Sequence, residues 1–251
     1  MLLIGLDAAS QLSNFGFAIG SVESDKVSIK EAGIIGDDEY AIEDMIANHL
    51  RDADRAVVAI DAPLGWPAAL GNALVPHAAG DNLSVEKNSL FKRNTDKTVR
   101  SVTGKNPLEI GADKIARATH TALEVLNRLR KKSRLTLPLL WSTEFSGAGV
   151  IEVYPGATLK MHGAPSSAYK KPDEKAARDA IVKCVGGTIP DLKRYVSAKA
   201  DVFDACLCLL AAHDFMMGAC RSPGQDELED ARKEGWIWVR WSSGSAEVIT
   251  K

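Results

Sequence analysis

Three aspartates occur where a carboxylate is costly unless a cation, a hydrogen-bond network or solvent meets it. Asp7 and Asp61 each end a short apolar run, and Asp204 lies within an otherwise apolar helical stretch. No histidine accompanies them at the spacing of a metal site, and an all-oxygen ligand set selects hard cations such as Mg²⁺ or Mn²⁺ over zinc. Two such ions about 4 Å apart activate water and stabilise the leaving oxygen in phosphodiester cleavage. The three residues are therefore the predicted catalytic residues and metal ligands of a phosphodiester hydrolase.

A fourth acid extends this candidate set. Asp201 lies three residues before Asp204, so both side chains can project from one face of a helix predicted over 198–218. An acid in the first helical turn is also explained by the positive end of the helix dipole, which stabilises it by about 0.3 to 1 kcal/mol. Asp204 lies past the first three backbone donors, where this explanation weakens. We expect Asp204 to bind metal and Asp201 to be an additional candidate ligand.

The segments that carry Asp7 and Asp61 predict neighbouring strands of one sheet. The apolar run before Asp7, a returning segment at 15–19 and an alternating segment at 27–33 predict an antiparallel meander. A helix predicted over 38–51 connects the meander to the apolar run before Asp61, which is typical of a strand buried on both faces. A right-handed crossover places this strand beside the first and parallel to it. Because adjacent strands lie about 4.8 Å apart, the two aspartates would face one small volume.

A largely helical insertion or cap is predicted over about 64–140. Its first part, up to residue 107, lacks sustained periodicity and is rich in glycine, proline and asparagine, whereas 108–132 has the apolar stripe and basic end of one long helix. The basic residues of the first part form either a solvated face or a contact with an anionic ligand. Among them, Arg93 and Lys97 are the candidates to hold a phosphate, so both are predicted substrate-binding residues.

A third buried strand is predicted over 149–154, and Glu152 interrupts its apolar run. A carboxylate inside such a strand requires a partner. Two interpretations stay open for Glu152. It either forms a salt bridge to a nearby lysine or arginine, or it belongs to the site that contains Asp7 and Asp61.

The overall composition indicates one folded domain over 1–251. The chain has 251 residues, of which 45% are hydrophobic and 25% are charged, as is typical of an α/β core with an insertion. No apolar run approaches the roughly 20 residues of a membrane helix, and the N-terminal run is too short for a signal peptide. We therefore expect a cytoplasmic location and no membrane contact. The formal net charge of -2 neither supports nor excludes a nucleic-acid partner.

Five short motifs occur in an order and spacing that resembles the domain of unknown function 429 family, regarded as predicted nucleases of the ribonuclease-H-like superfamily: GLDAAS, VAIDAP, RNTD, IEVYP and DVFDA. The resemblance implies an α/β fold with a mixed five-stranded sheet in the order 3-2-1-4-5, flanked by helices. It also implies metal-binding carboxylates at Asp7, Asp61 and the Asp201 and Asp204 pair, which is similar to the Holliday-junction resolvase branch of that superfamily. The residues carried over as lining the site are Arg93, Asp96, Glu152 and Tyr154.

Three functions stay open at this point. A metal-dependent nuclease would use Asp7 to bridge two Mg²⁺ or Mn²⁺ ions, with Asp61 and Asp204 each holding one, and would act on DNA or RNA. An actin-like, sugar-kinase-type phosphotransferase would use the acid-ended strand and its turn as a phosphate hairpin. Its only candidate second loop contains Pro63, which lacks a backbone donor. The third is a non-catalytic metal-binding scaffold. The choice between DNA and RNA and the oligomeric state stay open.

Overall fold

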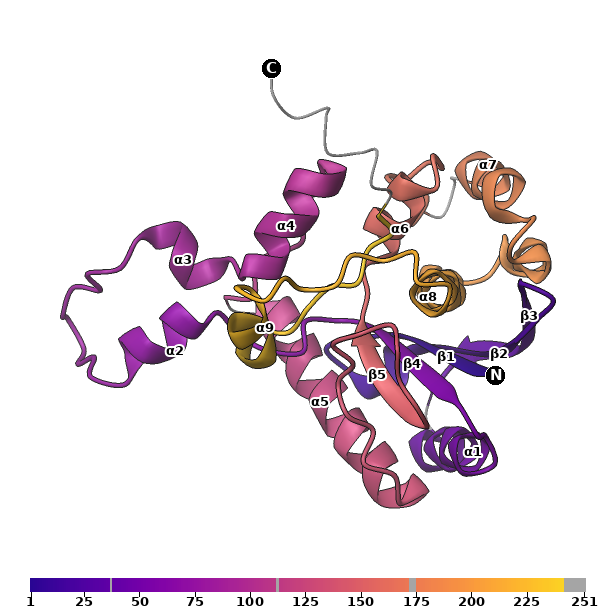
Figure 1. The fold of residues 1–251 in the computed structure, drawn as a ribbon, viewed down its shortest axis with the longest axis horizontal. Helices are drawn as coiled ribbons and strands as arrows, with labels where there is room; N and C mark the ends of the chain where they lie inside the picture. Colours follow the sequence, from indigo (N-terminus) through magenta and orange to yellow (C-terminus); the bar gives the residue numbers. More distant parts are fainter. Residues whose placement is uncertain (37, 112, 172–174, 242–251) are drawn as a thin grey trace.

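A mixed five-stranded sheet forms the centre of the molecule (Figure 1). The computed structural model describes residues 1–36, 38–111, 113–171 and 175–241, so the last ten residues of the predicted domain lie outside the described part. The first three strands form the predicted antiparallel meander, and the last two run parallel to the first: β1 (Leu2–Asp7), β2 (Gly16–Glu23), β3 (Lys26–Ile34), β4 (Ala56–Asp61) and β5 (Ala148–Glu152). Their order, β3-β2-β1-β4-β5, confirms the predicted fold class and strand order.

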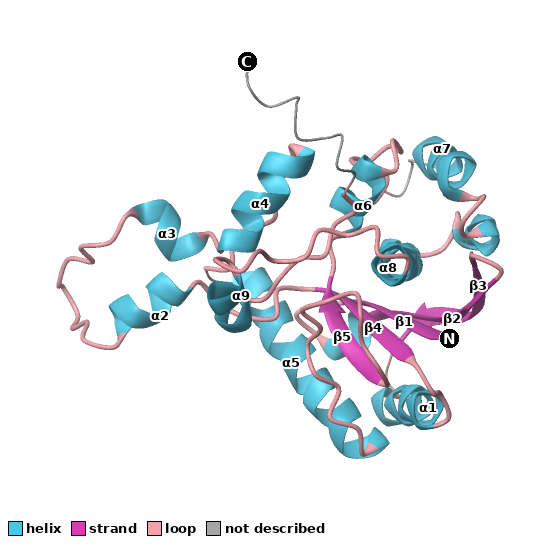
Figure 2. Ribbon diagram, viewed as in Figure 1, coloured by secondary structure: helices cyan, strands magenta, loops and turns pink. Residues whose placement is uncertain are grey.

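Helices cover both faces of the sheet (Figure 2). One face carries α8 (Ala200–Met216) with α6 (Pro155–Met161), α7 (Lys175–Val185) and the 3₁₀ helix η2 (Pro190–Tyr195), and the other carries α1 (Glu39–Arg51) and α5 (Asp113–Ser133). Side chains alternate between the faces along each strand. In β1, Leu3 packs on the α8 face, whereas Leu2, Ile4 and Leu6 pack on the α1 and α5 face. Asp7 lies four residues after Leu3, so this alternation places its side chain on the α8 face as well.

Two glycines let α8 lie unusually close to the sheet. A Cβ atom on Gly5 would lie 2.1 Å from the carbonyl oxygen of Ala205, and one on Gly16 would lie 2.0 Å from that of Asp201. Any larger residue at either position would push the first turns of α8 away. Because those turns carry Asp204, the two glycines fix how near this aspartate comes to the strands.

The predicted insertion at 64–140 divides into two parts. Its first part contains α2 (Ala68–Leu74), α3 (Lys87–Phe91) and α4 (Asn94–Thr103), and it projects away from the sheet (Figure 1). Its second part is α5, which packs beside α1 through a buried stripe that contains Val125 and Leu129. Since α5 completes the layer that crosses from β4 to β5, only the part before it departs from the central fold.

The segment after α9 (Leu228–Glu234) runs as an extended arm beside β5. Ile237 forms a parallel bridge with Glu152, and the Trp238 amide donates to the Glu152 carbonyl oxygen over 2.9 Å. The arm therefore lengthens the sheet edge next to the residues that precede α6. Across the described ranges, every helix is too short or too polar to cross a lipid bilayer.

Candidate metal centre

The end of the parallel pair β1 and β4 brings two aspartates together. Asp7 and Asp61 are the last residues of their strands and are paired in register. Both extend the set of side chains that faces α8, and α8 contributes Asp204 from its second turn. One carboxylate oxygen from each of the three lies within 4.8 Å of the others. We name these three residues the aspartate trio.

Burial makes the aspartate trio unfavourable as a set of bare charges. Asp204 is fully buried and Asp7 is 8% exposed. Burial, then the charges of Asp204 and Asp61, raise the pKa of Asp7 well above its usual range. Burial and the Asp204 charge raise the pKa of Asp61 to about 7, although Lys170 opposes the shift. Burial likewise raises the pKa of Asp204. A divalent cation would relieve both the desolvation and the mutual repulsion.

The oxygen atoms of the aspartate trio are suitable ligands for a hard cation. Both carboxylate oxygens of Asp204 are buried without a hydrogen bond from any residue that the structure describes. All the candidate ligand atoms are carboxylate oxygens, which Mg²⁺ and Mn²⁺ prefer. The hydroxyl of the adjacent Tyr169 is buried without a partner in the same part of the chain, and burial together with Asp204 raises its pKa. Lys170 is the cation paired with Asp204 in the described structure, and a bound ion would complete the coordination of the remaining oxygen atoms.

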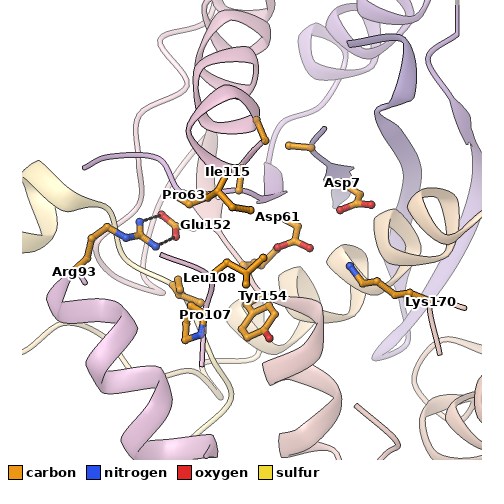
Figure 3. A pocket seen from close by; sticks show the side chains of 15 residues that line it. Asp7, Asp61, Pro63, Arg93, Pro107, Leu108, Ile115, Glu152, Tyr154 and Lys170 are labelled. Atoms are coloured by element: carbon orange, nitrogen blue, oxygen red, sulfur yellow. Dashed lines mark hydrogen bonds and ion pairs between the residues drawn. The ribbon is translucent and has the colours of Figure 1, made fainter. Parts of the chain in front are cut away.

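Lys170 is a site residue that the sequence did not indicate. Its ammonium forms an ion pair with Asp204, while 56% of its side chain stays exposed. Burial lowers the pKa of Lys170, but the charges of the three aspartates raise it above its usual value overall. It comes from the connection between α6 and α7, which lacks a recognisable motif, so no sequence signal could have singled it out. Figure 3 shows its amino group directed towards Asp7 and Asp61.

Asp201 lies outside the aspartate trio. It lines a separate hollow at the start of α8, together with Lys199 and the exposed side of Lys170. Its charge still contributes to the raised pKa values of Asp7 and Asp204. A role for Asp201 as a metal ligand therefore stays a prediction.

Glu152 belongs to a different charged group. It is in register with Ile60 and not with Asp61, so alternation turns its side chain to the opposite face of the sheet. It accepts two hydrogen bonds from Arg93, at 3.0 and 2.7 Å, as the dashed lines in Figure 3 mark. Burial raises the pKa of Glu152, and Arg93 opposes the shift. Of the two interpretations left open, the structure shows the salt bridge.

Arg93 has no free donor for a phosphate. Its remaining N–H groups bind Asp96, through two hydrogen bonds at 3.2 and 2.8 Å, and the Glu234 carbonyl oxygen at 2.9 Å. All five guanidinium N–H groups are thus used inside the protein, and the side chain is 1% exposed. The hypothesis that Arg93 holds a phosphate needs correction, because this guanidinium joins α4, β5 and the end of α9.

A cavity of about 200 Å³ opens beside the aspartate trio. Asp7, Asp61 and Lys170 line it, and Pro107, Leu108 and Ile115 from the projecting segment and α5 form an apolar wall (Figure 3). The predicted site residues Arg93, Glu152 and Tyr154 also line this cavity. Burial and the charge of Asp61 raise the pKa of Tyr154. Asp96 and Lys97 line a neighbouring hollow along α4 instead.

The strand order and the helices on both faces of the sheet define a mixed α/β fold, as the resemblance to ribonuclease-H-like proteins implied. The family model described as "Protein of unknown function (DUF429)" matches residues 16–229, and the chain belongs to this family, which confirms the resemblance found in the sequence.

One solved structure, described as T. thermophilus RuvC in complex with Holliday junction substrate, is similar with a TM-score of 0.37 and 12% sequence identity, covering 87% of this chain and 96% of that chain. No curated protein sequence matches the chain.

Proposed function

We propose that this protein is a metal-dependent phosphodiester hydrolase that acts on nucleic acid. The observation that supports this most directly is the aspartate trio, whose oxygens converge within 4.8 Å while both oxygens of Asp204 lack hydrogen bonds among the described residues. Buried acids that are only partly paired carry a desolvation cost of several kcal/mol, and a cation reduces that cost. The cavity beside them supplies space for a substrate group.

Each residue of the site has a proposed task. Asp7, Asp61 and Asp204 would hold the metal through their carboxylate oxygens, with Asp201 as an additional ligand. When bound, Mg²⁺ or Mn²⁺ supplies Lewis acidity to the phosphoryl group and lowers the pKa of water. Lys170 balances the excess negative charge and is free to pair with a phosphate once Asp204 binds metal. Pro107, Leu108 and Ile115 form an apolar wall on one side of the cavity.

Isothermal titration of Mn²⁺ into the wild-type protein and Asp7→Asn tests the metal site. We expect binding to the wild type and its loss in Asp7→Asn. Asp54→Asn is a matched control, because Asp54 is an exposed aspartate before the other end of β4. Failure of the wild-type protein to bind Mn²⁺ would contradict the two-ion mechanism and favour a scaffold.

Cleavage of single-stranded, duplex and branched DNA and RNA, with Mn²⁺ and with EDTA, tests the activity. We expect Mn²⁺-dependent cutting that Asp7→Asn abolishes and Asp54→Asn retains. Metal binding without cutting would instead direct attention to small phosphorylated substrates and to phosphotransfer. The cytoplasmic location expected from the sequence stays a prediction.

A further inference from the structure

We propose that the hollow along α4 binds the phosphate backbone of an unpaired nucleic-acid strand and leads it into the cavity beside the aspartate trio. This inference rests on the proposed function and names its substrate class. The hollow has a volume of about 700 Å³, larger than the carboxylate cavity itself. Three basic side chains, Lys92, Lys97 and Arg100, line it.

The hollow and the carboxylate cavity share a wall. Pro107 lines both, while Asn106 on one side of it lines only the hollow and Leu108 on the other side lines only the cavity. A nucleic-acid strand whose phosphates lie along α4 therefore has to pass only Pro107 to reach the aspartate trio. Leu108 is 70% exposed, so the passage is open to solvent.

Two of the three basic side chains of the hollow, Lys97 and Arg100, are not neutralised by nearby acids, whereas Lys92 pairs with Glu109 at 3.6 Å. Asp96 also lines the hollow, but both oxygens of this carboxylate accept hydrogen bonds from Arg93. Lys97 is exposed, and among the described residues its ammonium donates one hydrogen bond, to the Asn94 side chain at 3.5 Å. Arg100, one turn further along α4, is exposed and has no side-chain hydrogen bond or ion pair within the described residues. Two unpaired cations on one helical face are suited to successive phosphates.

The helix that carries these cations is held firmly against the rest of the site. Thr95 accepts a hydrogen bond from the Ile237 amide at 2.7 Å, and the Asn94 amide donates to Glu234 at 2.8 Å. Val99 is fully buried on the inner face of α4. Lys97 and Arg100 are therefore presented by a rigid element at a fixed position relative to the cavity.

The lining favours a single strand read through its phosphates. No aromatic side chain lines the hollow in the described structure, so stacking on bases does not contribute and recognition is independent of sequence. Asp7 and Asp61 line a small cavity, and Asp204 is fully buried. A flexible strand can bend over Pro107 into this cavity, whereas a stiff duplex cannot follow such a path.

Fluorescence anisotropy with a labelled 12-nucleotide oligo(dT) and a DNA hairpin of equal charge, both in EDTA, tests the inference. We expect Lys97→Ala/Arg100→Ala to weaken oligo(dT) binding about tenfold. The slope of log affinity against log salt should fall by about 1.4, from roughly 0.7 per lost phosphate contact on a single strand. Lys131→Ala/Arg134→Ala is the matched control, because it removes the same charges at the same sequence spacing from two exposed positions, one in the last turn of α5 and one directly after this helix.

Several outcomes would overturn the inference. Unchanged binding in the α4 double variant, an equal loss in the control, tighter binding to the hairpin, or no binding by the wild type would each do so. Thermal melting of both double variants, with Lys97→Ala alone as a milder substitution, keeps unfolding from imitating lost binding. Mn²⁺ titration separates the two proposals. If the α4 variant loses the strand while the wild-type protein binds no metal, the proposed function fails and the strand site stands.

Discussion

Two groups of buried acids each contribute to the lining of one cavity, and they differ in how completely the protein pairs their charges. Glu152 and Asp96 each accept two hydrogen bonds from the Arg93 guanidinium, which uses all five of its N–H groups within the protein. In the aspartate trio, neither oxygen of Asp204 accepts a hydrogen bond in the described structure. The only cation paired with Asp204 among these residues is the half-exposed Lys170. The first group is a completed ion-pair network, and the second is incomplete.

The difference shows that burial of an acid does not by itself indicate a functional site. Both groups contain carboxylates whose pKa burial raises. What separates them is whether the protein supplies enough donors and positive charge. The Arg93 group should therefore contribute to the stability of the fold, whereas the aspartate trio should reduce it until a cation binds.

Substitution of Arg93 should produce the largest effect. Arg93→Met leaves Glu152 and Asp96 buried without their partner, so we expect the free energy of unfolding to fall by about 3 to 5 kcal/mol. Urea unfolding monitored by circular dichroism measures the change. Lys92→Met is the control, since its ion pair with Glu109 is solvent-exposed and should contribute less than about 1 kcal/mol. A loss below 1 kcal/mol for Arg93→Met would show that the network is dispensable.

Replacing an acid by its amide should have opposite effects in the two groups. Asp7→Asn removes repulsion within the aspartate trio, so in EDTA the free energy of unfolding should stay equal or rise by on the order of 1 kcal/mol. The same variant should bind Mn²⁺ at least about 100-fold more weakly, or about 2.7 kcal/mol. Glu152→Gln is the matched counterpart, and it should destabilise the fold while leaving Mn²⁺ affinity unchanged. Destabilisation by Asp7→Asn in EDTA would place Asp7 in a structural ion pair instead.

The pH dependence of stability should also distinguish the aspartate trio. The folded protein raises the pKa of Asp61 to about 7, first by burial, whereas the unfolded value is near 3.9. The native state therefore binds more protons than the unfolded state between these values, and stability in EDTA should fall as the pH rises from about 4 to 7. Urea midpoints across this range measure the trend. Asp7→Asn should flatten it, and a rise in stability over the same interval would refute it.

The sequence predicted the sheet and the aspartate trio because both follow from short-range patterns. Continuous apolar runs predicted the central strands, and an acid at the end of each run placed Asp7 and Asp61 at equivalent positions. The roles of these residues in catalysis stay predictions. The role of Glu152 was ambiguous because a shift of one residue in the strand register would turn its side chain to the other face of the sheet. The pairing of Glu152 with Ile60 decides which face its side chain takes, and no local sequence pattern reports that pairing.

The other contacts around the site join residues that lie far apart in the sequence. Arg93 meets Glu152 across 59 residues of sequence and the Glu234 carbonyl across 141, so its partners could not be deduced from spacing. The bounds of the insertion or cap over about 64–140 stay a prediction, because the periodicity of α5 does not reveal that this helix packs beside α1. Whether the chain is one domain stays a prediction. Lys170 lies in a connection without a repeating pattern, and only the fold brings it to Asp204.

Substitution of Lys170 should have the smallest effect, and it tests most directly why the two groups of acids differ. Its ammonium pairs with the carboxylate that a metal ion would use, so binding of the ion requires Lys170 to move. In Lys170→Met this competition is absent, and we expect Mn²⁺ affinity to rise by about threefold to tenfold in an isothermal titration, less than the effect of Asp7→Asn because the lysine is half exposed. Lys171→Met is the control, since this neighbouring lysine is exposed. Equal affinities in all three proteins would mean that Lys170 does not compete with the ion. Weaker binding in Lys170→Met would instead show that the lysine holds the carboxylates in place for the metal.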